Sequence, residues 1–325
     1  MADLSAQLLS VVVPAYNEQE VLSEFHRRLD EVLAELPMSV EIVYINDGSE
    51  DQTLSLLHEL HQKDERVAIV DLSRNYGKEI ALSAGLRQAS GDAVVVIDAD
   101  LQDPPELIPK LIEHWNQGYD VVYAQRTRRE GETWLKKATA GAFYRLMQRV
   151  GHVKLPRDTG DFRLLSRRAV NALNSMDEQH RFMKGLFTWI GFRQVAVPYD
   201  RDPRYAGETK WNYWKLWNFA IEGLTSFTIA PLKFATYLGL LTAFGAFVFA
   251  IYTIIKTLIF GNPVPGYPSI IVIMLFLGGV QLMAIGVLGE YVGRIFTESK
   301  RRPLYFLNEY LPRRADKQNK NQDNS

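Results

Sequence analysis

Short apolar runs alternate with amphipathic stretches through the first part of the chain. The runs have the length and aliphatic content of buried strands, and they cover residues 9–13, 41–45, 67–72, 93–97 and 120–124. The stretches between them have apolar residues at helical spacing, and they cover residues 21–36, 51–61, 78–90 and 105–117. This alternation predicts an α/β fold with a Rossmann-like, mostly parallel sheet flanked by helices.

Two much longer apolar runs, residues 232–260 and 267–293, lie near the end of the chain. Each exceeds the roughly 20 residues that a helix needs to cross a bilayer, and an uncharged link of residues 261–266 joins them. We expect a transmembrane hairpin, because the alternative of two buried core helices fits poorly with this length and near-absence of charge. Basic residues flank the outer ends of the hairpin, which predicts that both termini are cytoplasmic.

The segments on either side of the hairpin are rich in aromatic residues, which favour the membrane–water interface. Residues 211–231 predict an amphipathic juxtamembrane segment on the membrane surface, with a helix packed under the N-terminal domain as the alternative. Residues 294–314 mix basic and aromatic side chains and predict a second interfacial segment. The expected organisation is a domain of residues 1–210, these flanking segments around the hairpin, and a polar disordered tail, residues 315–325.

Composition excludes several classes of function. The chain has 325 residues, a formal net charge of −1 and no cysteine, so bulk nucleic-acid binding, disulfides and thiolate metal sites are not expected. The first residues lack the basic start of a signal peptide. Neither Gly-x-Gly-x-x-Gly after the first strand nor a Gly-Lys-Ser/Thr loop is present, which disfavours a dinucleotide oxidoreductase or a P-loop enzyme.

Acidic and amide side chains follow the fourth predicted strand. Asp98, Asp100 and Gln102 come directly after residues 93–97, at the strand end where ligands bind in open α/β sheets. Their oxygen atoms suit Mg²⁺, which usually keeps substrate phosphates among its ligands. The alternative is that the acids only begin a turn. Residues 14–18 and 47–49 follow two further strands, and we expect the three strand ends to line one crevice.

These segments resemble the nucleotide-sugar signatures of the family-2 glycosyltransferases, which have the GT-A fold. The matching segments are residues 12–18 (VVPAYNE), 46–49 (NDGS) and 98–102 (DADLQ). Residues 73–78 (SRNYGK), 207–210 (GETK) and 288–295 (LGEYVGRI) are similar to the polyprenyl-phosphate glycosyltransferases. Within that group the chain most resembles the bacterial bactoprenol (undecaprenyl-phosphate) glucosyltransferases, which are related to the dolichol-phosphate mannose synthases.

The resemblance implies roles for individual residues. It implies nucleotide-sugar binding by Pro14, Tyr16, Glu18, Asp47, Arg204 and Lys210. It implies Mg²⁺ or Mn²⁺ binding by Asp98, Asp100 and Gln102, and acceptor-phosphate binding by Arg126, Lys137 and Arg145, beside Lys136; a solvated basic face is the alternative for these lysines and Arg145. Asp98, Asp100, Asp158 and Asp161 are the implied catalytic acids. The Glu-Asp pair of many soluble relatives is missing, which leaves the role of Asp158 and Asp161 open.

The implied activity is metal-dependent, inverting transfer of a sugar, with glucose from UDP-glucose expected, to undecaprenyl or another polyprenyl phosphate. The expected location is the cytoplasmic leaflet of a bacterial inner membrane, and a separate flippase and a downstream glycosyltransferase would handle the product. GDP-mannose, UDP-GlcNAc and a UDP-aminopentose stay open as donors, as does a homo-oligomer. A processive polysaccharide synthase is disfavoured because Gln-x-x-Arg-Trp is missing, and a non-catalytic scaffold because the metal acids are intact.

Overall fold

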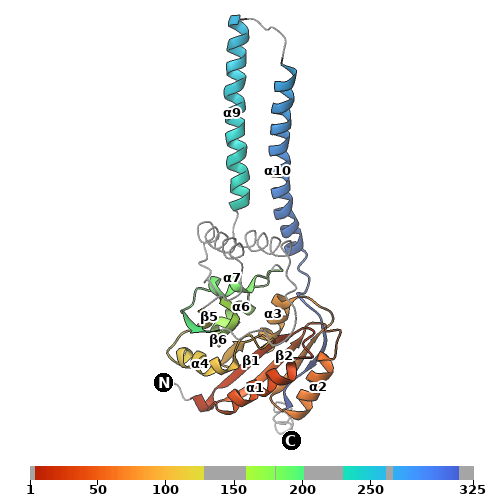
Figure 1. Ribbon diagram of the computed structural model, residues 1–325, viewed down its shortest axis with the longest axis vertical. Coiled ribbons are helices and arrows are strands. Elements are labelled where there is room, and N and C mark those ends of the chain that lie inside the picture. Colours follow the sequence, from red (N-terminus) through yellow and green to blue (C-terminus); the bar gives the residue numbers. More distant parts are fainter. Residues whose placement is uncertain (1–3, 128–158, 180, 201–229, 261–265, 315–325) are drawn as a thin grey trace.

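The computed structural model describes residues 4–127, 159–179, 181–200, 230–260 and 266–314. They form a sheet domain from which two long helices project (Figure 1). The strands are β1 (Leu8–Ala15), β2 (Ser39–Asn46), β3 (Val67–Leu72), β4 (Ala93–Val96), β5 (Val121–Arg126), β6 (Thr159–Ser166), β7 (Gln194–Tyr199) and β8 (Leu307–Leu311). Their order across the eight-stranded sheet is β7-β5-β6-β4-β1-β2-β3-β8.

The centre of the sheet is parallel. β1 pairs with β2 and β4, and β2 pairs with β3, all in parallel. β6 runs antiparallel between β4 and β5, and β7 lies parallel to β5. Strands that are covered on both faces read as continuous aliphatic runs, which is why the sequence located them. The predicted mostly parallel α/β sheet is confirmed, with β6 and β8 as antiparallel members.

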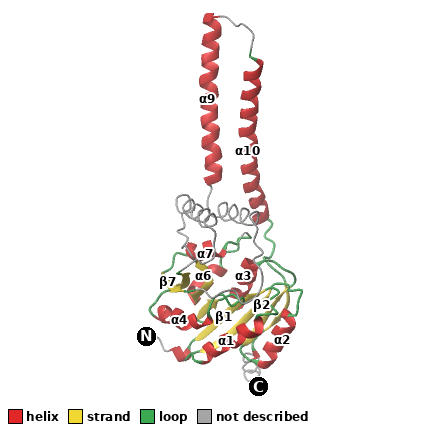
Figure 2. Cartoon of the chain, viewed as in Figure 1, coloured by secondary structure: helices red, strands yellow, loops and turns green. Residues whose placement is uncertain are grey.

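Helices cover both faces of the sheet (Figure 2). They are η1 (Leu4–Ala6), α1 (Leu22–Ala34), α2 (Thr53–Lys63), α3 (Lys78–Gln88), η2 (Pro105–Leu107), α4 (Ile108–Asn116), α6 (Arg167–Asn174) and α7 (Met183–Trp189). Successive strand residues point to opposite faces, so Val11 and Val13 of β1 join one core with Phe25. Val12 joins the other core with Leu82 of α3. The carboxyl ends of the central strands are therefore fixed by well-packed cores on both faces of the sheet.

Two long apolar helices form the hairpin that the sequence predicted. α9 (Ala230–Phe260) and α10 (Tyr267–Ser299) lie side by side and extend away from the sheet domain (Figure 1). Both are long and apolar enough to cross a membrane. Large apolar side chains, such as Phe244 and Leu282, are exposed along them, as expected for a surface that lipid would cover. α10 extends beyond residue 293, the predicted end of the second span, and reaches Ser299. The i,i+4 ion pair of Glu290 with Arg294 lies across this point and supports the helix there.

The prediction of an interfacial segment over residues 294–314 is wrong for its second half. Residues 307–311 form β8, which pairs antiparallel with the edge strand β3. Short alternating sequences such as this one pair with whatever edge is available, so their place depends on tertiary contacts. Because β8 and β3 share one sheet, the chain before and after the hairpin lies on the same side of any bilayer that the hairpin crosses. Residues 211–229 lie outside the described part of the chain.

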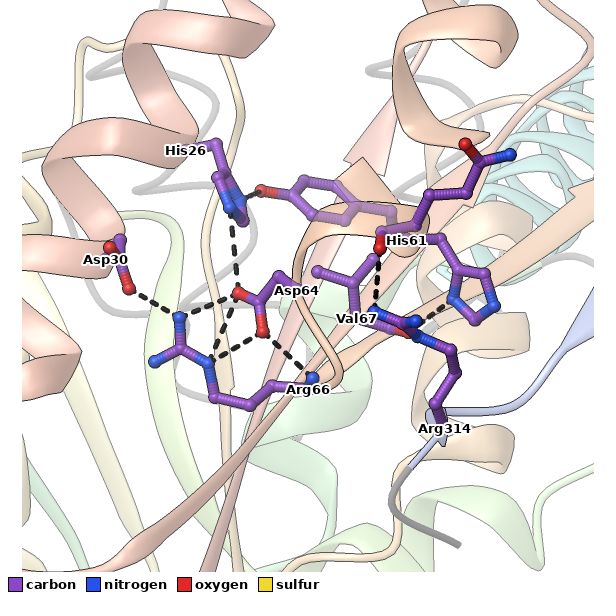
Figure 3. Close-up of polar contacts among 9 residues, drawn as sticks. His26, Asp30, His61, Asp64, Arg66, Val67 and Arg314 are labelled. Atoms are coloured by element: carbon purple, nitrogen blue, oxygen red, sulfur yellow. Dashed lines mark hydrogen bonds and ion pairs between the residues drawn. The ribbon is translucent and has the colours of Figure 1, made fainter. Parts of the chain in front are cut away.

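The basic residues that follow β8 contact protein. The backbone N–H of Arg314 donates to the carbonyl of Glu65 at 3.1 Å. Its guanidinium donates to the carbonyl of Gln62 at 2.7 Å, the contact drawn at the Arg314 side chain in Figure 3. Both carbonyls belong to the end of α2 and the turn before β3. Arg314 therefore fixes the chain beyond β8 to the sheet domain, where the sequence had suggested contact with the membrane surface.

Candidate active site

The turn after β4 carries the predicted metal acids. Leu101 lies in the left-handed region at φ +58° although its side chain is buried, a conformation that costs free energy for a residue with a branched side chain. Such strained residues cluster at functional sites. The backbone N–H of Gln102 donates to Oδ1 of Asp100 at 3.1 Å. The turn that the alternative interpretation predicted is thus present, and it is held in a strained form.

A lysine joins two carboxylates at this end of the sheet. Val96 of β4 lies opposite Arg163 of the antiparallel strand β6. Asp98 comes two residues after Val96 and Asp161 two residues before Arg163, so the two carboxylates lie next to each other. Nζ of Lys78 lies 2.6 Å from Oδ2 of Asp98 and 2.5 Å from Oδ2 of Asp161. Lys78 is the first residue of α3. The start of α3 therefore supplies a cation to both strands.

Burial and Lys78 act on the two carboxylates in opposite directions. Burial raises the pKa of Asp98 to about 6, although Lys78 opposes the rise. Burial alone would also raise the pKa of Asp161, but Lys78 and then Lys184 outweigh it and hold that pKa well below its usual range. Asp161 is therefore ionised at neutral pH, and Asp98 is the more easily protonated of the two.

The donor set fits a hard divalent cation. Asp98, Asp100 and Gln102 offer only oxygen ligands, which Mg²⁺ and Mn²⁺ accept. Within the described residues, Oδ1 of Asp161 is buried without a hydrogen-bond partner. No group of three or more His, Cys, Asp or Glu side chains in that part of the chain has the arrangement of a metal site. Mg²⁺ commonly keeps substrate phosphate oxygens among its ligands, so the protein need not supply the whole ligand set.

Asp47, which follows β2, holds the loop that leads to Lys78. Its carboxylate accepts from the backbone N–H groups of Tyr76 at 2.7 Å and Gly77 at 2.9 Å, and burial raises its pKa. Gly48 has φ +64°, and a Cβ there would lie 2.4 Å from the backbone of Arg74, so only glycine fits. Residues 76–78 thus join Asp47 to Asp98, just after β4, and to Asp161, near the start of β6.

The loop after β1 is bonded to the loop after β2. Asn17 has φ +55°, and its backbone N–H donates to Oγ of Ser49 at 3.0 Å. Pro14 is inside β1, paired with Ile45, and Tyr16 is 39% exposed on the loop. The backbone N–H of Glu18 donates to a threonine hydroxyl at the start of α2 at 2.9 Å. The structure thus brings the residues of the first two strand ends together, as the sequence predicted.

Arg126, at the end of β5, lies beside the start of β6, which carries Asp161. Its Nε donates to the hydroxyl of Tyr199 at 3.4 Å, and that hydroxyl donates to the buried carboxylate of Asp103. A Cβ on Gly160 would lie 3.1 Å from Nη2 of Arg126. The guanidinium is therefore held by its hydrogen bond to Tyr199 on one side, and on the other it lies against the backbone of Gly160, next to Asp161.

Sequence reasoning assigned no role to Lys78, Asp103 or Tyr199. Lys78 was part of a matching motif, and a lysine directly after a glycine at a helix start was the signal that could have found it. Tyr199 gave no signal, because its contact with Asp103 depends on the pairing of β5 with β7. The predicted residues Lys136, Lys137, Arg145, Asp158, Arg204 and Lys210 lie outside the described residues.

Two family descriptions and several curated proteins match the sequence of the chain. The family described as "Glycosyl transferase family 2" matches residues 10–173, and the "GtrB C-terminal hairpin" matches residues 230–295. An uncharacterized glycosyltransferase of Synechocystis sp. is 53% identical over 309 residues, which are 94% of this chain and 97% of the relative. Bactoprenol glucosyl transferase of Shigella phage SfV is 50% identical over 299 residues, which are 92% of this chain and 97% of the relative.

Among solved structures, mannosyl-3-phosphoglycerate synthase from Rubrobacter xylanophilus aligns with a TM-score of 0.46 and 18% identity, over 66% of this chain and 71% of that chain. The sequence relatives cover nearly the whole chain, the sheet domain together with the apolar hairpin. The chain therefore belongs to glycosyl transferase family 2 and is a glycosyltransferase with a C-terminal hairpin of two apolar helices.

Proposed function

We propose that the protein transfers glucose from UDP-glucose to undecaprenyl phosphate and releases UDP. The relatives named bactoprenol glucosyl transferases support the choice of acceptor and sugar. The observation that carries the proposal is the cluster of Asp98, Asp161, Lys78 and Arg126 in a chain that also has an apolar hairpin. Such a cluster suits a reaction between two phosphate-bearing substrates, one of which is anchored in lipid.

The proposed donor site extends from the β1 and β2 loops to the β4 turn. Pro14, Tyr16, Glu18 and Asp47 form the nucleotide side, with Arg204 and Lys210 assigned to it by resemblance. Asp47 already accepts two backbone hydrogen bonds, and a carboxylate has further lone pairs for a base or ribose. A Mg²⁺ or Mn²⁺ ion bound by Asp98, Asp100 and Gln102 would stabilise the negative charge that develops on the leaving diphosphate.

The acceptor needs positioning more than deprotonation, because a phosphate monoester is already an anion near neutral pH. The planar fork of Arg126 can hold such a phosphate through two charge-assisted hydrogen bonds. Lys137 and Arg145 are proposed to complete this anion site. To Asp161, which is ionised beside Lys78, we assign a hydrogen bond from a sugar hydroxyl, and to Asp158 we assign no role.

The proposed reaction is a single in-line displacement. A phosphate oxygen of the acceptor forms a bond to the anomeric carbon while the bond from that carbon to the β-phosphate oxygen of UDP breaks. UDP leaves with the electron pair, and the anomeric configuration inverts. No proton has to be removed from the acceptor, which agrees with the missing Glu-Asp pair.

The sheet domain and both termini are proposed to lie on the cytoplasmic side of a bacterial inner membrane. The basic flanks of the hairpin support the cytoplasmic side. The shared sheet of β3 and β8 supports a common side for the two flanks. The product would then need a separate flippase and a downstream transferase.

A donor panel tests the proposed function. The full-length protein in detergent is incubated with undecaprenyl phosphate and UDP-glucose, UDP-GlcNAc, GDP-mannose or a UDP-aminopentose, and the lipid product is identified by mass spectrometry. We expect a hexosyl product from UDP-glucose, with the anomeric configuration opposite to that of the donor by NMR. A product from another donor would correct the sugar, and a lipid-linked polymer or no product would overturn the proposal. Asp98→Asn is the inactive control.

A further inference from the structure

The strand that follows the hairpin carries a bulge at Asn308. Glu309 of β8 lies opposite Asp71 of β3, and Leu307 lies opposite Leu72, so Asn308 is an extra residue between these two pairs. Bulges commonly redirect a side chain. Here Nδ2 of Asn308 donates to Oδ2 of Asp71 at 2.7 Å. The bulge therefore directs a polar side chain from the C-terminal strand to a buried carboxylate.

Asp71 passes this contact on to the β2 loop. Asp71 is 3% exposed as a residue, and its second oxygen, Oδ1, accepts from Nδ2 of Asn46 at 2.7 Å. Asn46 is the last residue of β2 and precedes Asp47, and its own Oδ1 accepts from the backbone N–H of Ser49 at 3.3 Å. A continuous line of hydrogen bonds thus runs from Asn308 through Asp71 to the loop that carries Asp47.

A second set of hydrogen bonds starts at Phe306, the residue just before β8. The carbonyl of Phe306 accepts from the backbone N–H of Ser73 at 3.0 Å, and the backbone N–H of Phe306 donates to the hydroxyl of Tyr76 at 3.3 Å. Tyr76 in turn donates its own backbone N–H to Asp47 at 2.7 Å. The loop that is bonded to Asp47 is therefore itself bonded to the chain just before β8.

The chain around β8 is fixed at both ends. Before it, the side chain of Glu298, near the end of α10, accepts from the backbone N–H of Gln179 at 2.8 Å. After it, Arg314 is bonded to the carbonyls of Gln62 and Glu65. The chain that follows the hairpin is thus anchored to the sheet domain on both sides of β8, which fixes the position of β8 on the sheet.

We propose that Asn308 is a positioning residue for the nucleotide side of the donor site, and that β8 holds the Asp47 loop in its binding conformation. The inference rests on the proposed function only where it assigns that loop to the nucleotide. If the inference holds, donor binding by the sheet domain depends on β8, a strand that comes after the hairpin in the chain. The competing reading is that β8 only covers the edge of the sheet, as many proteins do to prevent edge-to-edge pairing.

A charge swap separates the two readings. Asn308→Asp puts a second carboxylate against Asp71 and removes the donor. In the double variant Asn308→Asp/Asp71→Asn, the new amide at position 71 can donate to the new carboxylate at 308, while its carbonyl still accepts from Asn46. The swap therefore restores both hydrogen bonds, with the negative charge moved from position 71 to position 308.

The measurements are the dissociation constant of UDP in the presence of Mn²⁺, the donor KM and kcat, and the melting temperature of the full-length protein in detergent. We expect Asn308→Asp to weaken UDP binding and raise the donor KM by about fivefold, which is close to 1 kcal/mol, with kcat nearly unchanged. The swap should return both values to within about twofold of the unmodified protein. Glu309→Gln, on the same strand as Asn308, changes only an exposed contact with His58 of α2 and is the matched control.

Asn308→Asp that melts at a lower temperature but binds UDP normally would overturn the inference and leave β8 as edge cover. If Asn308→Asp does not fold, Asn308→Ala removes the same hydrogen bond without adding a charge. Weaker UDP binding by Asn308→Ala would then support the inference, and normal binding would overturn it. An unmodified protein that does not bind UDP would overturn the proposed function itself, and the inference with it.

Discussion

The ammonium group of Lys78 lies 2.5 Å from a carboxylate oxygen of Asp161, and the same ammonium bonds Asp98 at 2.6 Å. The two carboxylates come from neighbouring antiparallel strands, where like charges at close range destabilise the pairing. Lys78 neutralises that repulsion before any other cation arrives. The protein therefore has its own cation at the centre of the proposed donor site.

Removal of this ammonium should make the fold depend on divalent metal. We expect Lys78→Met to lower the melting temperature in excess chelator by a few degrees, since the side chain is 41% exposed and the lost attraction is about 1 kcal/mol. Mn²⁺ should raise the melting temperature of the variant by more than that of the unmodified protein. Lys63→Met, which loses only an exposed pair with Glu59, is the control. An equal response to Mn²⁺ in all three proteins would contradict the prediction.

The metal acids themselves are tested by turnover. Asp100→Ala should remove nearly all transfer activity while the protein stays folded, because Asp100 is proposed to bind the metal that stabilises the leaving diphosphate. Activity with undecaprenyl phosphate is measured with Mg²⁺, with Mn²⁺ and with excess EDTA, and circular dichroism checks the fold. Full activity in EDTA would reject the metal role. Asp177→Ala, which removes an exposed partner of Arg87, is the control substitution of an acid.

The sequence located the parallel strands and the acids at their ends, because both are local patterns. Asp98 and Asp47 directly follow aliphatic runs, and the carboxyl ends of parallel strands meet at one edge of a sheet. The neighbour of Asp98 was beyond that reasoning: Asp161 lies there only because β6 inserts antiparallel between β4 and β5. The register of a distant antiparallel strand is not encoded in the local pattern of either partner.

β8 shows the same limit at the other edge of the sheet. Its sequence, Leu-Asn-Glu-Tyr-Leu, lies close to basic and aromatic residues that favour a membrane interface. Only its pairing with β3 and the bond from Asn308 to Asp71 distinguish a strand from an interfacial segment. These contacts join residues far apart in the chain, so they follow from the three-dimensional arrangement and not from the composition of the segment.

The acceptor role of Arg126 predicts a selective kinetic defect. Arg126→Ala should lower kcat/KM for undecaprenyl phosphate about tenfold to hundredfold, because a charge-assisted contact to an anion contributes roughly 1.5–3 kcal/mol. UDP binding without lipid should change little. Arg126→Lys should recover only part of the loss, since an ammonium lacks the planar fork. A large loss of UDP binding in Arg126→Ala would place the guanidinium on the donor instead.

Gly160 gives an independent test of the same site. A Cβ at this position would lie 3.1 Å from Nη2 of Arg126, so Gly160→Ala should displace the guanidinium by a few tenths of an ångström without removing it. We expect acceptor kcat/KM to fall by less than in Arg126→Ala, with the melting temperature nearly unchanged. An equal loss in a Gly160→Ala/Arg126→Ala double variant and in Arg126→Ala alone would show that both act through one contact. Additive losses would contradict that shared pathway.

The absence of cysteine from the chain allows a direct test of topology. Asn262→Cys labels the link between the two apolar helices, and Ser325→Cys labels the C-terminal end. Because β8 shares a sheet with β3, the C-terminal end should be on the side of the sheet domain. A membrane-impermeant maleimide should therefore modify position 262 in intact spheroplasts and position 325 only after permeabilisation. Modification of position 325 in intact spheroplasts would overturn the proposed orientation.

His26 predicts how the stability of the sheet domain depends on pH. Its Nδ1 is hydrogen-bonded to the hydroxyl of Tyr44 at 2.9 Å, and its Nε2 lies 3.7 Å from the carboxylate of Asp64, as Figure 3 shows. Burial lowers the pKa of His26 and outweighs the opposing effects of Asp64 and Asp30. The folded protein therefore keeps His26 neutral at a pH where the unfolded chain already binds a proton.

This difference gives the sign of the effect. Above about pH 6.5, the usual pKa of histidine, both states are neutral at His26 and its contribution to stability is complete. As the pH falls below that value, the unfolded chain takes up the proton first, so the free energy of unfolding decreases. His26→Gln, which cannot titrate and can still bond Tyr44, should flatten the fall in melting temperature between about pH 7.5 and pH 5.5. An unaltered slope in His26→Gln would show that other groups cause the fall.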